Sequence, residues 1–303
     1  MVARGAKGER WWQTLRGIVD ARVARLGFLV FGTSVPVRVN LIHILNHLLV
    51  RAAFLLAGGW YRAWPHRAEA RRFHRDGFVA FSPALPRPWL EMFARRIDGL
   101  FAIPGNTFGT KGYDTTAGLI GRVSDFPELA SLLTQEIIRT VEACFSSYFK
   151  TCSVNIYRIM PTPRPEDSSF LWHFDKSPRQ MVKLMIYLDD STGETGAFRL
   201  KPKPLSYKLK RAGFWDRWKA EPFREVLNEG ASTRVFEGPM GTAVLFSAGE
   251  CIHKATSPLH GHRDVVTFTL HPSLWPWRTH FAAISATKEL SENYSSCARP
   301  FSD

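Results

Sequence analysis

A succession of short strand-like segments, separated by turns rich in Gly, Pro and Asp, fills residues 154–271 and constrains the fold more than any other feature of the sequence. Many short strands with such turns are typical of an antiparallel sandwich or jelly roll. One further strand is expected ahead of this region, at residues 77–81. The predicted strands of the region itself are residues 154–159, 170–174, 181–188, 197–200, 233–236, 242–246, 251–254 and 265–271.

Helical segments precede and interrupt these strands. Apolar residues at helical spacing predict amphipathic helices over residues 88–100 and 126–149, which we expect to pack on a sheet. A short charged helix is expected at residues 66–75, and residues 205–228, rich in Lys, Arg and Trp, are interpreted as a helical insertion. The predicted fold class is therefore α+β, with a basic, partly apolar helical extension at residues 1–65 and a main domain at residues 66–303.

Positive charge is concentrated near the N-terminus. Residues 1–75 hold 13 Lys and Arg against 3 Asp and Glu, an excess of ten within a net charge of +13 for the 303 residues. Such a segment is suited to anionic membrane lipid, nucleic acid or an acidic partner. Zinc-finger spacing, an RRM signature and a helix-turn-helix pattern are all missing from it, so nucleic acid is the weakest of these partners.

A long apolar run lies within this basic region, at residues 41–60. His43, His47 and Arg51 interrupt it, so a membrane-spanning helix would have to immerse a charge. On helical spacing one face is apolar, and it consists of Leu41, Ile44, Leu45, Leu48, Leu49, Ala52, Leu55 and Leu56. Two interpretations are equally open: the face covers the core or a dimer partner, or it docks on a membrane surface.

Four cysteines without CxxC spacing, and no clean secretory signal, favour a reducing cytoplasm. Peripheral attachment to the inner face of the cytoplasmic membrane is compatible with the basic extension. The oligomeric state is not predicted.

The segment Trp172-His173-Phe174-Asp175 carries the strongest chemical signal. On an extended chain, side chains two residues apart project to the same face, so one cation could bind both His173 and Asp175. Two imidazoles and a carboxylate form the facial set that suits non-haem Fe(II), and His253 can supply the second imidazole. An isolated HxD triplet is weak evidence, because chance matches are common and most surface histidines are only solvated.

Four further residues are candidates for binding a co-substrate. Arg263 follows His253 by ten residues, and its guanidinium is suited to a charge-assisted pair with a carboxylate. Asn155 and Tyr157 share one face of a predicted strand, although Tyr157 is equally well explained as a core aromatic. Lys183 is either a partner of an acidic ligand or, with slightly better support, a solvated lysine at a sheet edge.

Several segments, in order, resemble the phytanoyl-CoA dioxygenase-like branch of the Fe(II)- and 2-oxoglutarate-dependent oxygenases. The resemblance covers roughly residues 70–275. The matching segments are FHRDGFV (73–79), WHFD (172–175), MIYLDD (185–190), GETGAFRL (193–200), GTAVLF (241–246), His253, and Arg263 with TFTLHP (267–272). Ordered agreement of this kind is more specific than any single triplet.

This resemblance implies a double-stranded β-helix in which His173, Asp175 and His253 bind iron. It also implies that Arg263 binds the C5 carboxylate of 2-oxoglutarate, with O2 as the other co-substrate. Retention of Asp175 then favours hydroxylation of an unactivated C–H bond over halogenation. Where the family usually has Pro-Gly-Ser-His, this chain has Lys201-Pro202-Lys203-Pro204, and that departure leaves the substrate open.

Several substrates and functions remain compatible with the sequence. The basic and aromatic segments favour an anionic, lipid-linked substrate, and the bacterial hydroxylases of Kdo, the acidic sugar of lipopolysaccharide, share this character. A small soluble metabolite or an acyl thioester is the alternative. Outside this enzyme class, a cupin-like metalloenzyme without 2-oxoglutarate and a non-catalytic metal-binding module at the membrane surface also remain open.

Overall fold

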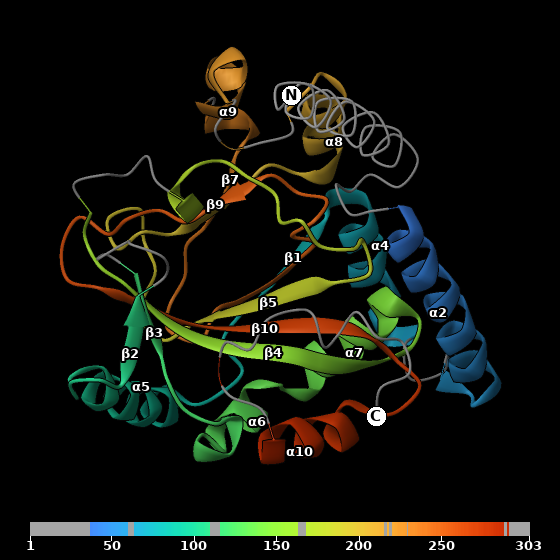
Figure 1. Ribbon diagram of the computed structural model, residues 1–303, viewed down its shortest axis with the longest axis horizontal. Helices are drawn as coiled ribbons and strands as arrows, with labels where there is room; N and C mark the ends of the chain where they lie inside the picture. Colours follow the sequence, from blue (N-terminus) through green and yellow to red (C-terminus); the bar gives the residue numbers. More distant parts are fainter. Residues whose placement is uncertain are drawn as a thin grey trace, which may run out of the picture.

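The computed structural model describes residues 37–59, 64–109, 116–162, 168–214, 217, 220–228, 230–287 and 290. Two antiparallel sheets face one another, and most of the helices lie beyond the larger sheet (Figure 1). Among the described residues, no helix is long and apolar enough to cross a membrane. The first 36 residues, which carry much of the expected basic extension, fall outside the described part.

The larger sheet has seven strands in the order β1-β8-β5-β10-β4-β3-β2, and every paired neighbour is antiparallel. Its longest members, β4 and β10, pair over almost their whole length, with one irregularity between Thr269 and Leu270. The strands are β1 (Phe78–Phe81), β2 (Thr107–Gly109), β3 (Thr116–Leu119), β4 (Tyr148–Ile159), β5 (Val182–Tyr187), β8 (Ala243–Phe246) and β10 (Arg263–Ser273).

The smaller sheet has the order β7-β6-β9. It consists of β6 (Phe198–Leu200), β7 (Arg234–Phe236) and β9 (His253–Lys254). Between the sheets lies an apolar cluster that includes Tyr187, Phe198 and Val265. This arrangement confirms the expected α+β architecture with a double-stranded β-helix.

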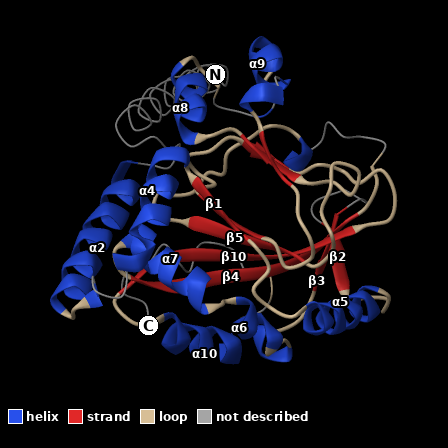
Figure 2. Ribbon diagram, turned by 180° about the vertical axis from the view of Figure 1, so that it is seen from behind, coloured by secondary structure: helices blue, strands red, loops and turns tan. Residues whose placement is uncertain are grey.

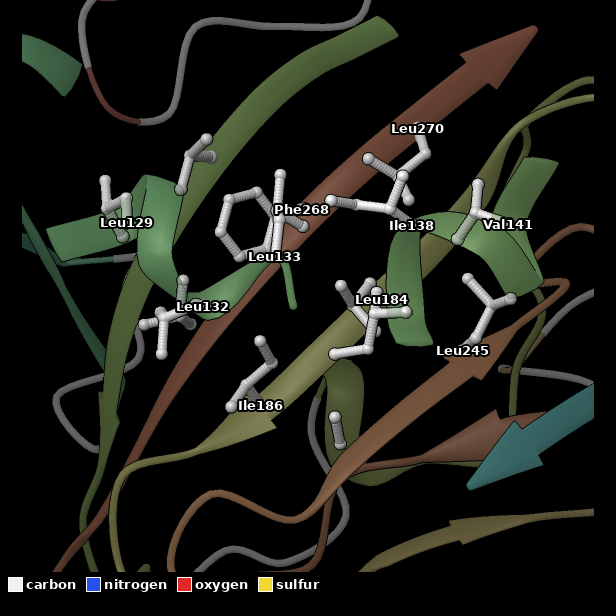
Figure 3. Packing of buried hydrophobic residues seen from close by; sticks show 14 of the residues in the cluster. Leu129, Leu132, Leu133, Ile138, Val141, Leu184, Ile186, Leu245, Phe268 and Leu270 are labelled. Atoms are coloured by element: carbon white, nitrogen blue, oxygen red, sulfur yellow. The ribbon is translucent and has the colours of Figure 1, made fainter. Parts of the chain in front are cut away.

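Helices cover the other face of the larger sheet. Figure 3 shows that apolar side chains of α6 and α7 pack on β5, β8 and β10. Val141, Leu184 and Phe268 in this layer are fully buried. Alternation along each strand therefore separates a helix-facing core from a face directed to the smaller sheet. The helices are α4 (Arg67–Asp76), α5 (Arg87–Phe101), α6 (Glu128–Leu132), α7 (Gln135–Phe145) and α10 (Trp277–Thr287), with one-turn 3₁₀ helices at Trp64–His66 and Val123–Asp125.

Several predicted elements needed correction. The helix expected over residues 126–149 is two helices, because the chain leaves helical geometry at Leu133 and Thr134 and again at Ser146, which has a left-handed backbone (φ 50°). The strand expected at residues 170–174 is a 3₁₀ turn (Ser168–Phe170) followed by a single bridge at His173. Strands β2 and β3 and helix α10 were not predicted, since they lack a strong apolar period.

The helix α2 (Val37–Leu56) contains most of the apolar run, and its orientation overturns the expectation that the apolar face covers the core, whereas a dimer partner stays a prediction. Polar residues face the protein: His43 Nδ1 lies 2.7 Å from His271 Nε2, and His47 Nε2 lies 2.7 Å from the carbonyl oxygen of Phe145. Leu45, Leu48 and Leu49 point outward. The apolar face therefore does not cover the core, because α2 is anchored through hydrogen bonds and through Val50 and Phe54.

The expected insertion forms α8 (Lys203–Arg211) and α9 (Arg224–Asn228), together with 3₁₀ turns at Glu221–Phe223 and Gly230–Ser232. These elements lie at the same end of the molecule as the smaller sheet, where Figure 1 labels β7 and β9 below α8 and α9. Not all of their positive charge is superficial: Lys210 is 1% exposed, and its Nζ donates to the carbonyl oxygen of Gly249 at 2.6 Å. Part of the basic character of the insertion is therefore structural.

The described cysteines differ from one another. Cys144 and Cys251 are buried free thiols, and burial raises the pKa of Cys251 to about 12. Cys152 is disulfide-bonded, which the expectation of a reducing cytoplasm did not anticipate.

Candidate metal centre

His173 and His253 come together through a β-bridge. The backbone N–H of His173 donates to the carbonyl of His253 at 2.9 Å, and the reverse bond is 2.7 Å. A further bond, from the N–H of Asp175 to the carbonyl of Ala248 at 2.9 Å, holds the next part of the segment. Because His173 and Asp175 are two residues apart on this extended stretch, both side chains point between the sheets, as the sequence predicts.

Each imidazole is fixed by a hydrogen bond within its own segment. His173 Nδ1 donates to the carbonyl of Leu171 at 2.8 Å, and His253 Nδ1 donates to the carbonyl of Cys251 at 2.9 Å. With the proton on Nδ1, the lone pair of Nε2 remains available, which is the usual arrangement of a metal-binding histidine. Both side chains are buried.

The carboxylate of Asp175 closes the set. Its Oδ1 lies 3.7 Å from His173 Nε2 and 3.8 Å from His253 Nε2. One atom from each residue lies within 4.8 Å of the other two, so a single ion could contact all three. Two nitrogens and one oxygen presented from one side leave the remaining coordination positions free, which fits the facial set for Fe(II).

The electrostatics of the group favour metal binding over protonation. Burial, assisted by the charge of the other imidazole, lowers the pKa of His173 to about 3, and burial lowers the pKa of His253 to about 4. Burial alone would raise the pKa of Asp175, but Lys183 and the two imidazoles outweigh it and hold this pKa far below its usual range. At neutral pH the site therefore presents two neutral imidazoles and one carboxylate.

Lys183 lies at the centre of the site and not at a solvated sheet edge. Its Nζ is 2.6 Å from Asp175 Oδ2, and the two side chains are 22% and 18% exposed. The two carboxylate oxygens thus have different neighbours: Oδ2 faces the ammonium, whereas Oδ1 faces the imidazoles. Lys183 consequently fixes the carboxylate so that a single oxygen is directed to the candidate metal position.

Arg263, the first residue of β10, is 1% exposed. Its Nε and Nη1 have no hydrogen-bond partner among the described residues, while the hydroxyl of Tyr187 lies beside the guanidinium. A buried charged group whose N–H donors have no acceptor costs free energy, so we expect these donors to bind an acceptor that enters the site. A carboxylate meets this requirement, and the position therefore fits one end of a dicarboxylic acid.

Register places the other predicted residues on the same face. On β10, Val265 and Thr267 alternate with Arg263, and they pair with Tyr157 and Asn155 of β4. Cross-strand partners project to the same side of a sheet. Both residues are half-buried; Tyr157 also packs against the apolar cluster between the sheets, so its core interpretation holds.

Two residues near the site were not singled out from the sequence. The Tyr187 hydroxyl donates to the carbonyl of Phe236 at 2.9 Å and accepts from the N–H of Phe198 at 3.0 Å, so it braces the guanidinium of Arg263. Arg217, in the insertion, lies close enough for its charge to lower the pKa of both imidazoles. Strand spacing was a signal for Tyr187, which lies two residues after Met185 and four after Lys183, but no local signal distinguished Arg217 from its basic neighbours.

A second group of metal-type side chains, Asp189, His262 and Asp264, lies near the start of β10. Its carboxylates already have partners within the protein: Arg158 donates to Asp264 from Nε at 2.9 Å and from Nη2 at 2.7 Å, and Asp189 accepts the N–H of Asp264. We interpret this group as structural.

Comparison with known proteins agrees with this geometry. No family model matches the chain, and no curated protein is similar to it in sequence. Solved structures do match: HygX from Streptomyces hygroscopicus, with nickel and 2-oxoglutarate bound, has a TM-score of 0.50 and 15% identity over 69% of this chain and 88% of its own. EctD from S. alaskensis, with bound Fe, has a TM-score of 0.52 and 13% identity over 68% and 76% of the two chains.

The chain shares the fold of these metal-binding proteins. The expected double-stranded β-helix is thereby confirmed, and with it the likeness to Fe(II)- and 2-oxoglutarate-dependent oxygenases at the level of the fold. The narrower assignment to the phytanoyl-CoA dioxygenase-like branch stays a prediction.

Proposed function

We propose that this protein is a non-haem Fe(II)- and 2-oxoglutarate-dependent dioxygenase that hydroxylates a C–H bond of an organic substrate. The observation that carries the proposal is the meeting of His173, Asp175 and His253 between the two sheets, on the side of the larger sheet to which the buried Arg263 also points. Neither group alone is as specific, because a metal triad also suits other chemistry and a buried arginine also serves structural roles.

Each residue has a defined task in this proposal. The imidazole Nε2 atoms and Asp175 Oδ1 hold the metal, while Lys183 orients the carboxylate and compensates its charge. Arg263 pairs with the C5 carboxylate of 2-oxoglutarate, and Tyr187 keeps the guanidinium in position. Asn155 and Tyr157, on the same face, are proposed to contact the bound co-substrate.

The bound iron and 2-oxoglutarate supply the oxidising chemistry, in which O2 converts 2-oxoglutarate to succinate and CO2 and places one oxygen atom in the substrate C–H bond. The chain provides orientation, desolvation and charge compensation. The presence of Asp175 supports hydroxylation, because a halogenating enzyme would need the position of this carboxylate for halide.

For the substrate, we propose an anionic organic molecule, and more narrowly a lipid-linked sugar acid such as Kdo. Arg217, whose charge reaches both imidazoles, supports an anionic substrate. A small soluble metabolite or an acyl thioester remains the alternative.

The proposal is tested by O2-dependent release of labelled CO2 from C1-labelled 2-oxoglutarate, with Fe(II) and purified full-length protein. We expect slow turnover even without substrate, and its loss in His173→Ala and His253→Ala. Arg263→Ala should weaken 2-oxoglutarate binding by about 10–100-fold, because charge-assisted hydrogen bonds contribute about 1.5–3 kcal/mol. Arg278→Ala, at an exposed position of α10, is the matched control.

Three other outcomes would redirect the assignment. Iron binding without any effect of 2-oxoglutarate, or unchanged 2-oxoglutarate binding in Arg263→Ala, would favour a cupin-like metalloenzyme. Folded protein that binds no iron would leave a binding module as the better explanation.

A further inference from the structure

The helix α2 presents its hydrophobic side to the surroundings. Seven large aliphatic residues, between 44% and 90% exposed, form what we call the α2 apolar face: Leu41, Ile42, Leu45, Leu48, Leu49, Leu55 and Leu56. A contiguous exposed surface of this kind on a helix is the usual mark of an interaction site. The other exposed aliphatic residues of the described chain, such as Val226 and Leu259, are scattered.

The orientation of α2 is fixed by contacts on its opposite side. His43 is hydrogen-bonded to His271, and His47 is hydrogen-bonded to the carbonyl oxygen of Phe145. Phe54 packs edge-on against Tyr148, with ring centroids 5.0 Å apart. Val50 and Phe54 are each 2% exposed. Rotating the helix to bury its leucines would break these hydrogen bonds and expose these two side chains, so the outward apolar face is a stable feature of the fold.

Positive charge lies beside this face. Figure 1 and Figure 2 both place α4 next to α2 at the same end of the molecule. Arg67, Arg71 and Arg72 of α4 are exposed, whereas Glu69 is half-buried and Asp76 is paired with Arg75. The one charged residue in the described side chains of α2, Arg51, is also exposed.

A cavity of about 460 Å³ opens where the two helices meet. It is lined by Ile44, His47 and Arg51 from α2 and by Phe73 and His74 from α4, with Arg179 and Glu250 also contributing. Glu250 is compensated, because its carboxylate lies 3.0 Å from Arg179 Nε and 3.1 Å from Lys203 Nζ. The cavity is therefore a cationic recess with hydrogen-bonding side chains, and it lies beside the α2 apolar face.

We propose that α2 and α4 form a docking surface for an anionic phospholipid membrane. The α2 apolar face enters the boundary between head groups and acyl chains, the α4 arginines contact lipid phosphates, and the cavity receives a head group. A helix lying in the plane of the membrane, with apolar residues on one side and cations beside it, is the usual form of such an attachment. The excess of ten positive charges in residues 1–75 has the sign that this partner requires.

This inference does not depend on the proposed catalytic activity. The candidate metal centre uses the face of β5 that carries Lys183, whereas Val182, which lines the cavity, points to the helix side of the sheet. Membrane binding and turnover can therefore fail separately.

The test is co-sedimentation of the full-length protein with vesicles of phosphatidylcholine alone and with vesicles containing about 30% phosphatidylglycerol. We expect strong binding to the anionic vesicles only. Replacing Leu45, Leu48 and Leu49 by serine should reduce this binding at least tenfold, because it removes the centre of the apolar face. Arg71→Gln with Arg72→Gln should also reduce it about tenfold or more and should weaken its dependence on salt.

The matched control replaces Val226, Val235 and Leu259, three exposed aliphatic residues elsewhere, by serine, and it should bind vesicles like the wild type. Circular dichroism and urea unfolding verify that each variant is folded. Equal sedimentation of the leucine variant and the wild type, or binding that ignores lipid charge, would overturn the proposal.

Measurements on the same variants without lipid distinguish two other possible occupants of the α2 apolar face. If the face binds a second copy of the chain, the wild type will sediment as a dimer in the ultracentrifuge and the leucine variant as a monomer. If another segment of the chain covers it, the leucine variant will have a clearly lower Tm. Either result would replace the membrane as the partner.

Discussion

Lys183 shows how a single side chain can define a metal ligand. In an apolar strand, a lysine is expected to extend to solvent, yet its Nζ lies 2.6 Å from Asp175 Oδ2. Threading this cation into the interior has a desolvation cost, which the carboxylate offsets. The pair thereby holds Oδ1 toward the two imidazoles before any metal binds.

We predict that Lys183→Met destabilises the metal-free protein by roughly 1–3 kcal/mol, because a mostly buried carboxylate loses its cation. Saturating Mn(II), used as a redox-inert metal, should narrow this difference, since the ion then supplies the missing positive charge. Urea unfolding with and without Mn(II) measures both quantities. Lys176→Met, at an exposed neighbouring position, is the control; a loss of stability that is the same with and without metal would contradict the assigned role.

At the scale of elements, α2 is attached to the sheet through a pair of buried histidines. Burial, assisted by the charge of Lys150, lowers the pKa of His43; burial, assisted by His43 and Lys150, lowers that of His271 well below 6.5. Both are therefore neutral in the folded protein at neutral pH, where one can donate to the other across the 2.7 Å contact.

The pH dependence follows from these lowered values. Below about pH 6.5 the unfolded chain binds protons that the folded protein excludes, so the free energy of unfolding falls as the pH falls. Each such group contributes at most about 1.4 kcal/mol per pH unit between its unfolded and folded pKa.

We predict that the free energy of unfolding decreases from pH 7 to pH 5. In His43→Leu this decrease should be less steep, by up to about 1.4 kcal/mol per pH unit, which corresponds to one bound proton. Urea unfolding at several pH values gives the two slopes. His260→Leu, at an exposed position in the turn before β10, is the control variant. Identical slopes for wild type and His43→Leu would mean that this pair does not govern the attachment of α2.

At the scale of the whole molecule, the two sheets create a site that neither contains alone. His253 comes from the smaller sheet, and Arg263 and Lys183 come from the larger one. His173 reaches the centre from the segment between the 3₁₀ turn at Ser168–Phe170 and β5. A ligand bound among them should therefore oppose separation of the sheets and stabilise the entire fold.

We predict that Mn(II) and 2-oxoglutarate together raise the free energy of unfolding by about 2.7 kcal/mol when the limiting ligand is at 100 times its Kd. Mn(II) alone or 2-oxoglutarate alone should raise the free energy of unfolding by less, because the metal completes the binding position of the keto acid. Differential scanning calorimetry, with EDTA to remove the metal, tests this. His253→Ala should show no metal-dependent shift, and a shift retained in this variant would place the metal elsewhere.

Sequence alone indicated the candidate metal ligands, Arg263 and the architecture around them, but not Tyr187 or Arg217. Short apolar runs bounded by turn residues predicted strands at residues 181–188 and 265–271, which correspond to β5 and β10, and the one-residue spacing of His173 and Asp175 directed both side chains to one face. These are local properties of the chain, so they can be inferred without knowledge of distant partners.

Only the tertiary structure decided which partners these residues meet. Lys183 and Lys210 look like surface cations in the sequence, but long-range contacts with Asp175 and Gly249 make them interior residues. The amphipathic pattern of α2 likewise did not decide which side of the helix faces the protein. The inward side is set by His271, 228 residues from His43, and by Phe145, 98 residues from His47. A periodic pattern gives two faces, and the choice between them depends on hydrogen-bond partners that only the folded chain supplies.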